Sequence, residues 1–240
     1  MVDAEFQGQL MGYDRASTLF SPEGRIFQVE YAEKTVRLGA SSIGFICKDG
    51  VAIVADKRLI DPLLVGKSIF KIHEIDDHII ASFAGILSDG RILIERAQLY
   101  AQQHRVTYNE DIDVESVARD VANIKQAYTQ YGGVRPFGVE IIFAGINVDG
   151  SKKLYVTDVT GNYNAYKAIA IGENDEKIKE ILRKEYREDM TIKDAIKLAI
   201  KIFKKFLGKD FNYERLDIAY IDEKRKVKRI SPKEAEENFK

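Results

Sequence analysis

The chain has 240 residues, of which 45% are hydrophobic and 31% charged, so it is long enough to bury a full core and has an ordinary globular composition. Its formal net charge of -1 gives no reason to expect nucleic acid or an anionic membrane as the main partner, and no apolar stretch is long enough to span a bilayer. The single cysteine, Cys47, excludes an intramolecular disulfide and agrees with a reducing, cytoplasmic compartment, and the first residues do not resemble a signal peptide.

The N-terminal part predicts a tail, a tight turn and a helix. Residues 1–20 have no clean hydrophobic period and are expected to form a mobile tail. The sequence SPEG at 21–24 has turn chemistry, because proline fixes φ and glycine permits a positive φ. Apolar residues then recur at spacings of three and four from Ile26 to Val36, which predicts a helix that ends at Gly39.

The rest of the chain alternates between short apolar runs and longer amphipathic segments. Asp-Gly turns at 49–50 and 149–150 separate apolar runs and so predict β-hairpins, as does Asp76-Asp77. The expected strands cover about 43–47, 51–55, 69–75, 78–83, 139–146, 154–157, 166–171, 217–221 and 227–230. The expected helices cover about 88–103, 113–128, 174–187 and 192–207, with a short one from 231, and their N-caps are Ser88, Asp113, Thr191 and Ser231.

These elements follow one another as helix, strand pairs, helix pair, strands, helix pair and strand pair. Amphipathic helices need a sheet face to cover, and sheets as apolar as these need cover on both faces. The simplest closed arrangement is an α+β fold with two sheets face to face and a helix layer outside each, a four-layer αββα sandwich. No linker rich in proline, glycine or serine divides the chain, so one folded domain is expected.

Four strings carry the strongest local signal. The first three describe a tail, a turn and a helix with polar-tipped tyrosines, although composition alone favours an ordinary N-terminal helix cap. The fourth contains paired glycines and a proline, which require an unusual backbone or form a plain helix-to-strand turn. The strings are Tyr13-Asp14-Arg15, Phe20-Ser21-Pro22-Glu23-Gly24-Arg25, Phe27-Gln28-Val29-Glu30-Tyr31-Ala32 and Tyr128-Thr129-Gln130-Tyr131-Gly132-Gly133-Val134-Arg135-Pro136-Phe137-Gly138.

These strings closely resemble those of archaeal-type proteasome α subunits, which belong to a family of threonine peptidases. Shorter matches extend the resemblance over nearly the whole chain: Phe143-Ala144-Gly145, Tyr166-Lys167-Ala168, Ala170-Ile171-Gly172 and Glu185-Tyr186. The resemblance implies the sandwich of the N-terminal-nucleophile hydrolases, in agreement with the αββα order. It divides the chain into an N-terminal gate tail, residues 1–20, and an α-type domain, residues 21–240.

The resemblance also implies a subunit that is not itself an enzyme. Catalytic β-type relatives expose a threonine at the start of the first strand, and its hydroxyl attacks the substrate while its α-amine helps to carry the proton. Ala40 aligns with that threonine, has no hydroxyl and is preceded by 39 residues. Asp56 and Lys71 align with the catalytic carboxylate and lysine, but without a nucleophile Asp56 is expected to be structural. The rival hypothesis, an autonomous amidohydrolase, requires self-cleavage to expose Ser41.

The implied partners are other α subunits in a heptameric ring, β-type rings stacked below, unfolded polypeptide, and a regulatory ATPase ring such as the proteasome-activating nucleotidase. The implied gate residues are Tyr13, Asp14, Arg15, Pro22 and Tyr31. The implied activator-binding residues are Lys71, Gly24, Glu30 and Gly85. The implied pore constriction consists of Tyr131, Gly132, Gly133, Val134 and Arg135. A ring-closing scaffold without a gate is the alternative, and an exposed strand lysine is the alternative role for Lys71.

Three positions depart from the family pattern near the expected activator pocket. Phe70 stands where an acidic residue is common, Ala84 where serine is common, and Gly90 where alanine is expected. The three histidines have no metal-ligand spacing with one another or with Cys47, and no phosphate-binding loop is present. No metal and no cofactor are therefore expected.

Overall fold

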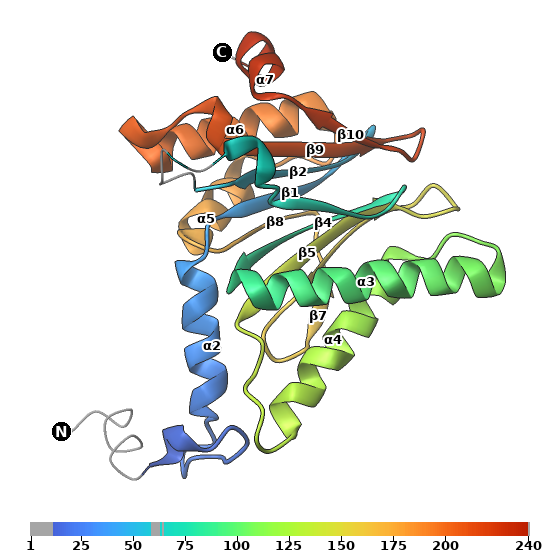
Figure 1. Ribbon diagram of the computed structural model, residues 1–240. Helices are drawn as coiled ribbons and strands as arrows, with labels where there is room; N and C mark the ends of the chain where they lie inside the picture. The colour runs from blue at the N-terminus through green and yellow to red at the C-terminus, as the bar shows by residue number, and fades with distance from the viewer. Residues whose placement is uncertain (1–11, 59–62, 64, 240) are drawn as a thin grey trace.

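A computed structural model describes residues 12–58, 63 and 65–239 of the chain (Figure 1). Two five-stranded antiparallel sheets lie face to face, and helices cover the outer face of each. This is the αββα sandwich that the element order predicts. Among the described residues, no helix combines the length and apolar character that crossing a membrane requires.

The first sheet has the strand order β10-β9-β2-β1-β8. Its strands are β1 (Ser42–Cys47), β2 (Gly50–Asp56), β8 (Ala168–Ile171), β9 (Leu216–Asp222) and β10 (Val227–Ile230). The outer face packs against α5 (Asp175–Glu185), α6 (Ile192–Leu207) and α7 (Pro232–Asn238). Helix α6 begins at the predicted N-cap Thr191 with a capping box, in which Thr191 and Asp194 bond each other's backbone N–H groups, and Ser231 and Glu234 form another at α7.

The second sheet has the strand order β3-β4-β5-β6-β7. Its strands are β3 (Ile72–Asp76), β4 (Ile79–Gly85), β5 (Val139–Ile146), β6 (Lys152–Thr157) and β7 (Tyr163–Ala165). Helices α3 (Leu87–Tyr108) and α4 (Val114–Gln130) cover its outer face. Between the sheets, fully buried aliphatic side chains from both inner faces form the central core, among them Ile53, Ile80, Ile142, Leu154 and Ile221.

Helix α2 (Phe27–Leu38) stands at one end of the sandwich and points away from it (Figure 1). The hydroxyl of Thr35 donates to the carbonyl of Gly138, 3.0 Å away, which fixes this helix to the start of β5. A Cβ at Gly39 would lie 2.2 Å from the backbone nitrogen of Gly85, so only glycine fits where the helix ends.

Some sequence-based expectations are wrong in detail. Helix α3 starts one residue before Ser88, with Ile86 at the N-cap, because the N–H of Ile86 donates to Gly138 O and its carbonyl accepts from Gly90 N–H. Asp113 occupies the N-cap of α4, but its side chain makes no capping bond. Helix α3 also runs on to Tyr108, and strand β7 has no counterpart in the prediction. Within the described ranges, four short 3₁₀ turns complete the fold: η1 (Tyr13–Arg15), η2 (Gly66–Ser68), η3 (Gly208–Asp210) and η4 (Tyr213–Arg215).

Candidate functional site

The described part of the N-terminal segment packs against α2. Residues Tyr13–Arg15 form a single 3₁₀ turn, and the side-chain amide of Gln28 donates to the carbonyl of Asp14, 2.5 Å away. The predicted mobile tail spans 1–20, and its first part, residues 1–11, lies outside the described residues. The rest of the tail includes an ordered turn that is tied to the helix.

The predicted turn before α2 is present. Gly24 has a φ of +76°, and its N–H donates to the carbonyl of Ser21 over 2.8 Å. Arg25 then forms two hydrogen bonds with the carboxylate of Glu30, one of them 2.6 Å long from Nε to Oε1, and its guanidinium lies 5.1 Å from the ring centre of Phe27. Glu30, an expected activator contact, is thus held by an ion pair at the first turn of the helix.

The five expected gate residues gather at this outer end of α2. Tyr13, Asp14 and Arg15 form η1, which contacts α2, while Pro22 is exposed in the turn and Tyr31 is half-buried in the helix. The Oδ1 atom of Asp14 is buried and has no hydrogen-bond partner among the described residues. A buried carboxylate oxygen without a donor is costly, so this site has unused capacity for a hydrogen bond.

The N-terminal end of β1, which we call its head, is buried and closed to solvent. Ala40 is 8% exposed, and the chain on its N-terminal side is held by the N–H of Glu173, which donates to the carbonyl of Gly39 over 2.8 Å. The hydroxyl of Ser41 is also buried and donates to the carbonyl of Glu173 over 2.5 Å. Ser41, the rival nucleophile, is therefore engaged as a hydrogen-bond donor, and the residues before Ala40 continue into α2.

Asp56 and Lys71 contact different neighbouring side chains. Arg215 donates two hydrogen bonds to the Asp56 carboxylate, of 2.6 and 2.8 Å, which confirms a structural role for Asp56. Lys71 is only 5% exposed, and its ammonium lies 5.0 Å from the ring centre of Phe83. Burial lowers the pKa of Lys71 to about 8, against the opposing charge of Asp56. The interpretation of Lys71 as an exposed strand lysine is wrong.

Within one chain, the four expected activator-binding residues form two separate pairs. Lys71 precedes β3 and Gly85 ends β4, so these two lie at the same end of an antiparallel strand pair. Gly24 and Glu30 lie at the outer end of α2, and the eight helical steps from Glu30 to Leu38 span about 12 Å. Gly85 has a φ of +122°, and a Cβ there would lie 2.1 Å from the carbonyl oxygen of Gly138, so it permits close strand packing.

The departures from the family pattern have partial physical explanations. A Cβ at Gly90 would lie 2.3 Å from Cε2 of Phe83, so the aromatic ring occupies the space that an alanine would need. Phe70 is 55% exposed, with the guanidinium of Arg229 lying 5.2 Å from its ring centre, and Ala84 is fully buried. Nothing in the structure explains why position 70 is aromatic.

The segment expected to form the constriction is an exposed loop with one fixed end. Tyr131 is exposed, and Gly132 and Gly133 have no atoms within 4 Å of where a Cβ would be. Arg135 donates hydrogen bonds of 2.6 and 2.7 Å to the Asp89 carboxylate, which also accepts the N–H of Gly138 at 3.0 Å. Burial by itself would raise the pKa of Asp89, but these bonds outweigh it and hold the pKa below its usual range.

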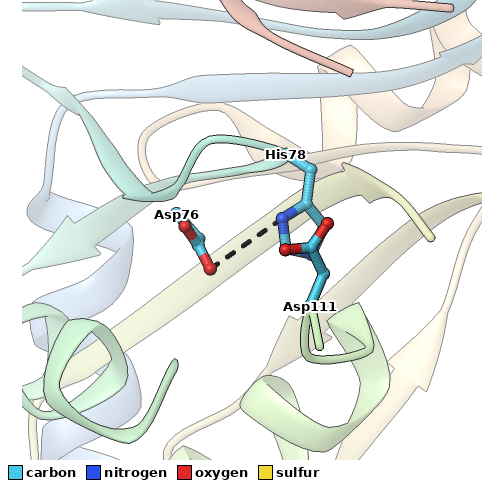
Figure 2. A group of neighbouring side chains, drawn as sticks. All are labelled: Asp76, His78 and Asp111. Carbon is cyan, nitrogen blue, oxygen red and sulfur yellow. Dashed lines mark ion pairs between the residues drawn. The ribbon is translucent and has the colours of Figure 1, made fainter. Parts of the chain in front are cut away.

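Sequence reasoning missed one polar cluster. Asp76, His78 and Asp111 place a carboxylate or imidazole atom each within 4.8 Å of the others (Figure 2). The spacing of histidines and cysteines does not indicate this cluster, because two of its members are carboxylates and Asp111 comes from a distant loop. The string Asp76-Asp77-His78 after a predicted strand is the one local signal that pointed there.

Comparison with known proteins places this geometry in a family. A family model described as "Proteasome subunit" matches residues 36–221, and a model of the N-terminal signature of A-type proteasome subunits matches residues 13–34. The proteasome α subunit of Aeropyrum pernix is 48% identical over 222 residues, which cover 92% of this chain and 86% of that protein. That of Archaeoglobus fulgidus is 46% identical over 225 residues, covering 93% of this chain and 91% of the relative. The first match takes in the second sheet and the first sheet up to Ile221 in β9, and the second match covers the segment with the expected gate residues. The chain therefore belongs to the proteasome α-subunit family.

Proposed function

We propose that the chain is a non-catalytic subunit of the α ring of a 20S proteasome core, where it forms the gated pore through which unfolded polypeptide reaches the interior. The observation that carries this proposal is Ala40 at the head of β1, the position at which catalytic relatives of the fold have threonine. Alanine offers neither nucleophile nor proton, and the residues before it continue into α2 rather than ending in a free α-amine.

In this proposal, residues 1–20 act as the gate and residues 21–240 as the ring-forming domain of a heptamer that stacks on β-type rings in the cytoplasm. The unpartnered Oδ1 of Asp14 supports a gate that makes a further hydrogen bond when its position changes. The exposed glycines at 132 and 133 support a pore rim, since residues without side chains leave room for an extended polypeptide.

Activator docking belongs to the same proposal. The ammonium of Lys71 would receive the C-terminal carboxylate of an ATPase-ring tail, because it offers three donors and keeps its charge at neutral pH with a pKa of about 8. The last three residues of an extended activator tail would span about 10 Å. This length is close to the part of α2 that separates Lys71 and Gly85 from Glu30 and Gly24. A tail that lies along α2 would therefore reach both pairs of residues.

The test is deletion of residues 2–16 in particles assembled with an active β subunit. Peptide hydrolysis should rise several-fold, because a gate biased by about 1–3 kcal/mol changes its open population by that order. Lys197→Ala on the exposed face of α6 serves as the matched control and should leave hydrolysis unchanged. An unchanged rate in intact particles that lack residues 2–16 would contradict the gate and leave a ring scaffold.

A further inference from the structure

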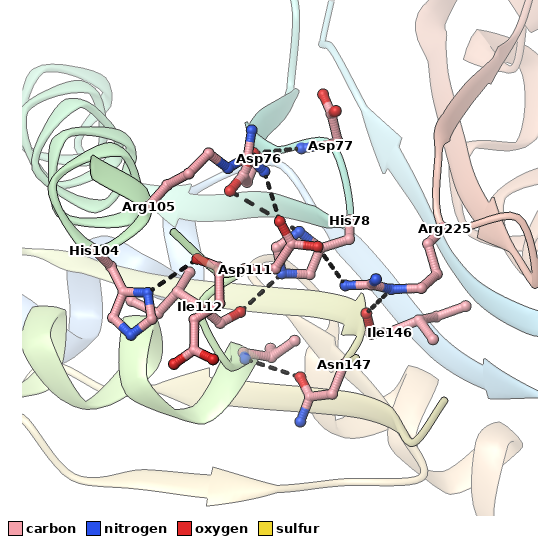
Figure 3. A network of polar contacts seen from close by, with 12 residues as sticks. Asp76, Asp77, His78, His104, Arg105, Asp111, Ile112, Ile146, Asn147 and Arg225 are labelled. Atoms are coloured by element: carbon pink, nitrogen blue, oxygen red, sulfur yellow. Dashed lines mark hydrogen bonds and ion pairs between the residues drawn. The ribbon is translucent and has the colours of Figure 1, made fainter. Parts of the chain in front are cut away.

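An ionic network with a buried centre ties together several turns at the end of the sandwich opposite α2 (Figures 1 and 3). We call Asp76, His78, Arg105, Asp111 and Arg225 the end network. Its members come from the end of β3, the β3–β4 turn, helix α3, the α3–α4 loop and the β9–β10 turn. The network thus joins both sheets to the helix pair that covers the second sheet.

The hydrogen bonds of His78 fix its tautomer. Its Nε2 lies 2.8 Å from the carbonyl oxygen of Ile112, and because a carbonyl only accepts, Nε2 carries a hydrogen. The other nitrogen, Nδ1, faces Oδ2 of Asp76 at 3.9 Å (Figure 2), and the two side chains are 1% and 2% exposed. Neither atom has a hydrogen-bond partner among the described residues. In a neutral imidazole, Nδ1 would point a lone pair at a buried carboxylate, which is costly.

The charge balance of the network favours a proton between Nδ1 of His78 and Oδ2 of Asp76 over a metal ion. Arg105 donates to Oδ1 of Asp76 at 2.7 Å and to Oδ1 of Asp111 at 2.9 Å, and Arg225 donates to Oδ2 of Asp111 at 2.8 Å. Two carboxylates are therefore balanced by two guanidinium groups. A divalent metal ion would leave two uncompensated positive charges in a largely buried place, whereas a proton would leave one. A bridging water would need about 4.5 Å between the two acceptors, more than the 3.9 Å present.

We infer that His78 carries a second proton on Nδ1, which donates to Oδ2 of Asp76 and makes the end network a pH-responsive lock. With that proton, the two unpartnered atoms become one charge-assisted hydrogen bond at a shorter distance. Without it, the same atoms repel each other, and the loops that the network holds loosen. Histidine is the side chain whose charge ordinarily changes between pH 5 and 8, which sets the range to be tested.

The carboxylate of Asp111, which lies beside the imidazole, keeps its charge across that range. Burial alone would raise the pKa of Asp111, but the positive charges of His78, Arg225 and Arg105 hold it below its usual range. The N–H of Asp77 donates to Oδ1 of Asp76 at 2.8 Å, and no cation other than these faces the carboxylates in the described network. On the loop side, His104 is partly exposed and lies beside the carbonyl of Glu110.

The lock holds a strained turn. Arg225 has a φ of +54°, which is unfavourable for a residue with a side chain, and its Nε donates to the carbonyl of Ile146 at 3.1 Å. Nearby, the N–H of Val227 donates to the carbonyl of Asp77 at 3.2 Å, a direct bond between the two sheets. Opening of the lock should therefore expose amides of the α3–α4 loop and of the β9–β10 turn together.

Hydrogen exchange by mass spectrometry on the full chain tests the lock. The readout is protection of amides at 109–113 and 223–227 between about pH 5.5 and 8, with each rate corrected for the intrinsic exchange rate at that pH. In the unmodified chain, protection should fall about tenfold or more as the pH rises, because the loss of one charge-assisted hydrogen bond changes the opening equilibrium by about that factor. His78→Gln can still donate to Ile112 but cannot take up a second proton, so its protection should not depend on pH. His104→Gln is the matched control and should behave as the unmodified chain does.

A second variant covers the case in which His78→Gln does not fold. In Asp76→Asn, the amide can donate permanently to Nδ1 of a neutral His78, so protection should stay high at every pH. Protection that is independent of pH in the unmodified chain, or that changes equally in His78→Gln or Asp76→Asn, would overturn the inference. So would a loss of protection on treatment with EDTA that Zn²⁺ restores at constant pH, because the cation between the two atoms would then be a metal ion.

Discussion

The ion pair between Arg135 and Asp89 should set the stability of the loop that we place at the pore. Arg135→Ala removes two charge-assisted hydrogen bonds, each worth roughly 1.5–3 kcal/mol when fully formed. The arginine side chain is 56% exposed, so solvent screens the pair, while Asp89 is buried and keeps the N–H of Gly138. We therefore expect a loss of about 1–2 kcal/mol in the free energy of unfolding. For a chain of this length, that lowers Tm by roughly 2–8 °C.

Denaturant unfolding of the purified chain measures this loss. Arg187→Ala is the matched control, because its pair with Asp189 is 3.6 Å long and exposed on both sides, and it should cost well under 1 kcal/mol. The cost of Arg135→Ala should shrink below about pH 4, because the pKa of Asp89 is depressed in the folded chain and its stabilising effect is lost as the pH falls. Equal costs for the two variants at neutral pH would show that the pair between Arg135 and Asp89 does not stabilise the loop.

Three further predictions concern the closed head of β1, the packing below the expected activator pocket and the buried lysine. A threonine-reactive probe should not label the purified chain, because Ala40 has no hydroxyl and Ser41 is engaged; a labelled peptide that begins at Ser41 would show otherwise. Gly90→Ala should destabilise the chain because the added Cβ would meet the ring of Phe83, although removing glycine from a helix normally gains about 1 kcal/mol. Adding Phe83→Leu should relieve this cost. A Gly90→Ala variant that is more stable than the unmodified chain would disprove the clash. Activator-stimulated degradation should decline as the pH rises through about 8, where Lys71 loses its charge. The Lys71→Arg variant should respond less to pH, because arginine keeps its charge. Identical pH profiles for the two proteins would contradict a role for Lys71 as the anchor.

Local chemistry predicted much of the fold. The Asp49-Gly50 turn places β1 against β2, and the Thr191 and Ser231 capping boxes start α6 and α7 where the sequence indicated. Ser88 failed as a helix start because a tertiary bond from Ile86 to Gly138 sets the first turn of α3. Strand β7 escaped prediction because three residues that pair with a single neighbour leave no usable period.

The candidate sites depended more on contacts between distant segments. Lys71 is buried with its ammonium 5.0 Å from the ring centre of Phe83 on β4, and a pattern that treats lysine as a surface residue cannot predict this. The pairing of Asp89 with Arg135 and the meeting of His78 with Asp111 likewise join segments far apart in the chain. Spacing along a sequence carries no information about such pairs, so the histidine network was absent from the prediction.

We propose that this chain closes a ring and has no active site of its own. Electron microscopy of the purified chain, alone and after co-expression with a β-type subunit, shows whether such rings form. We expect sevenfold rings, which cap the β-type rings when both proteins are present. A chain that stays monomeric under both conditions would not be a ring-forming subunit.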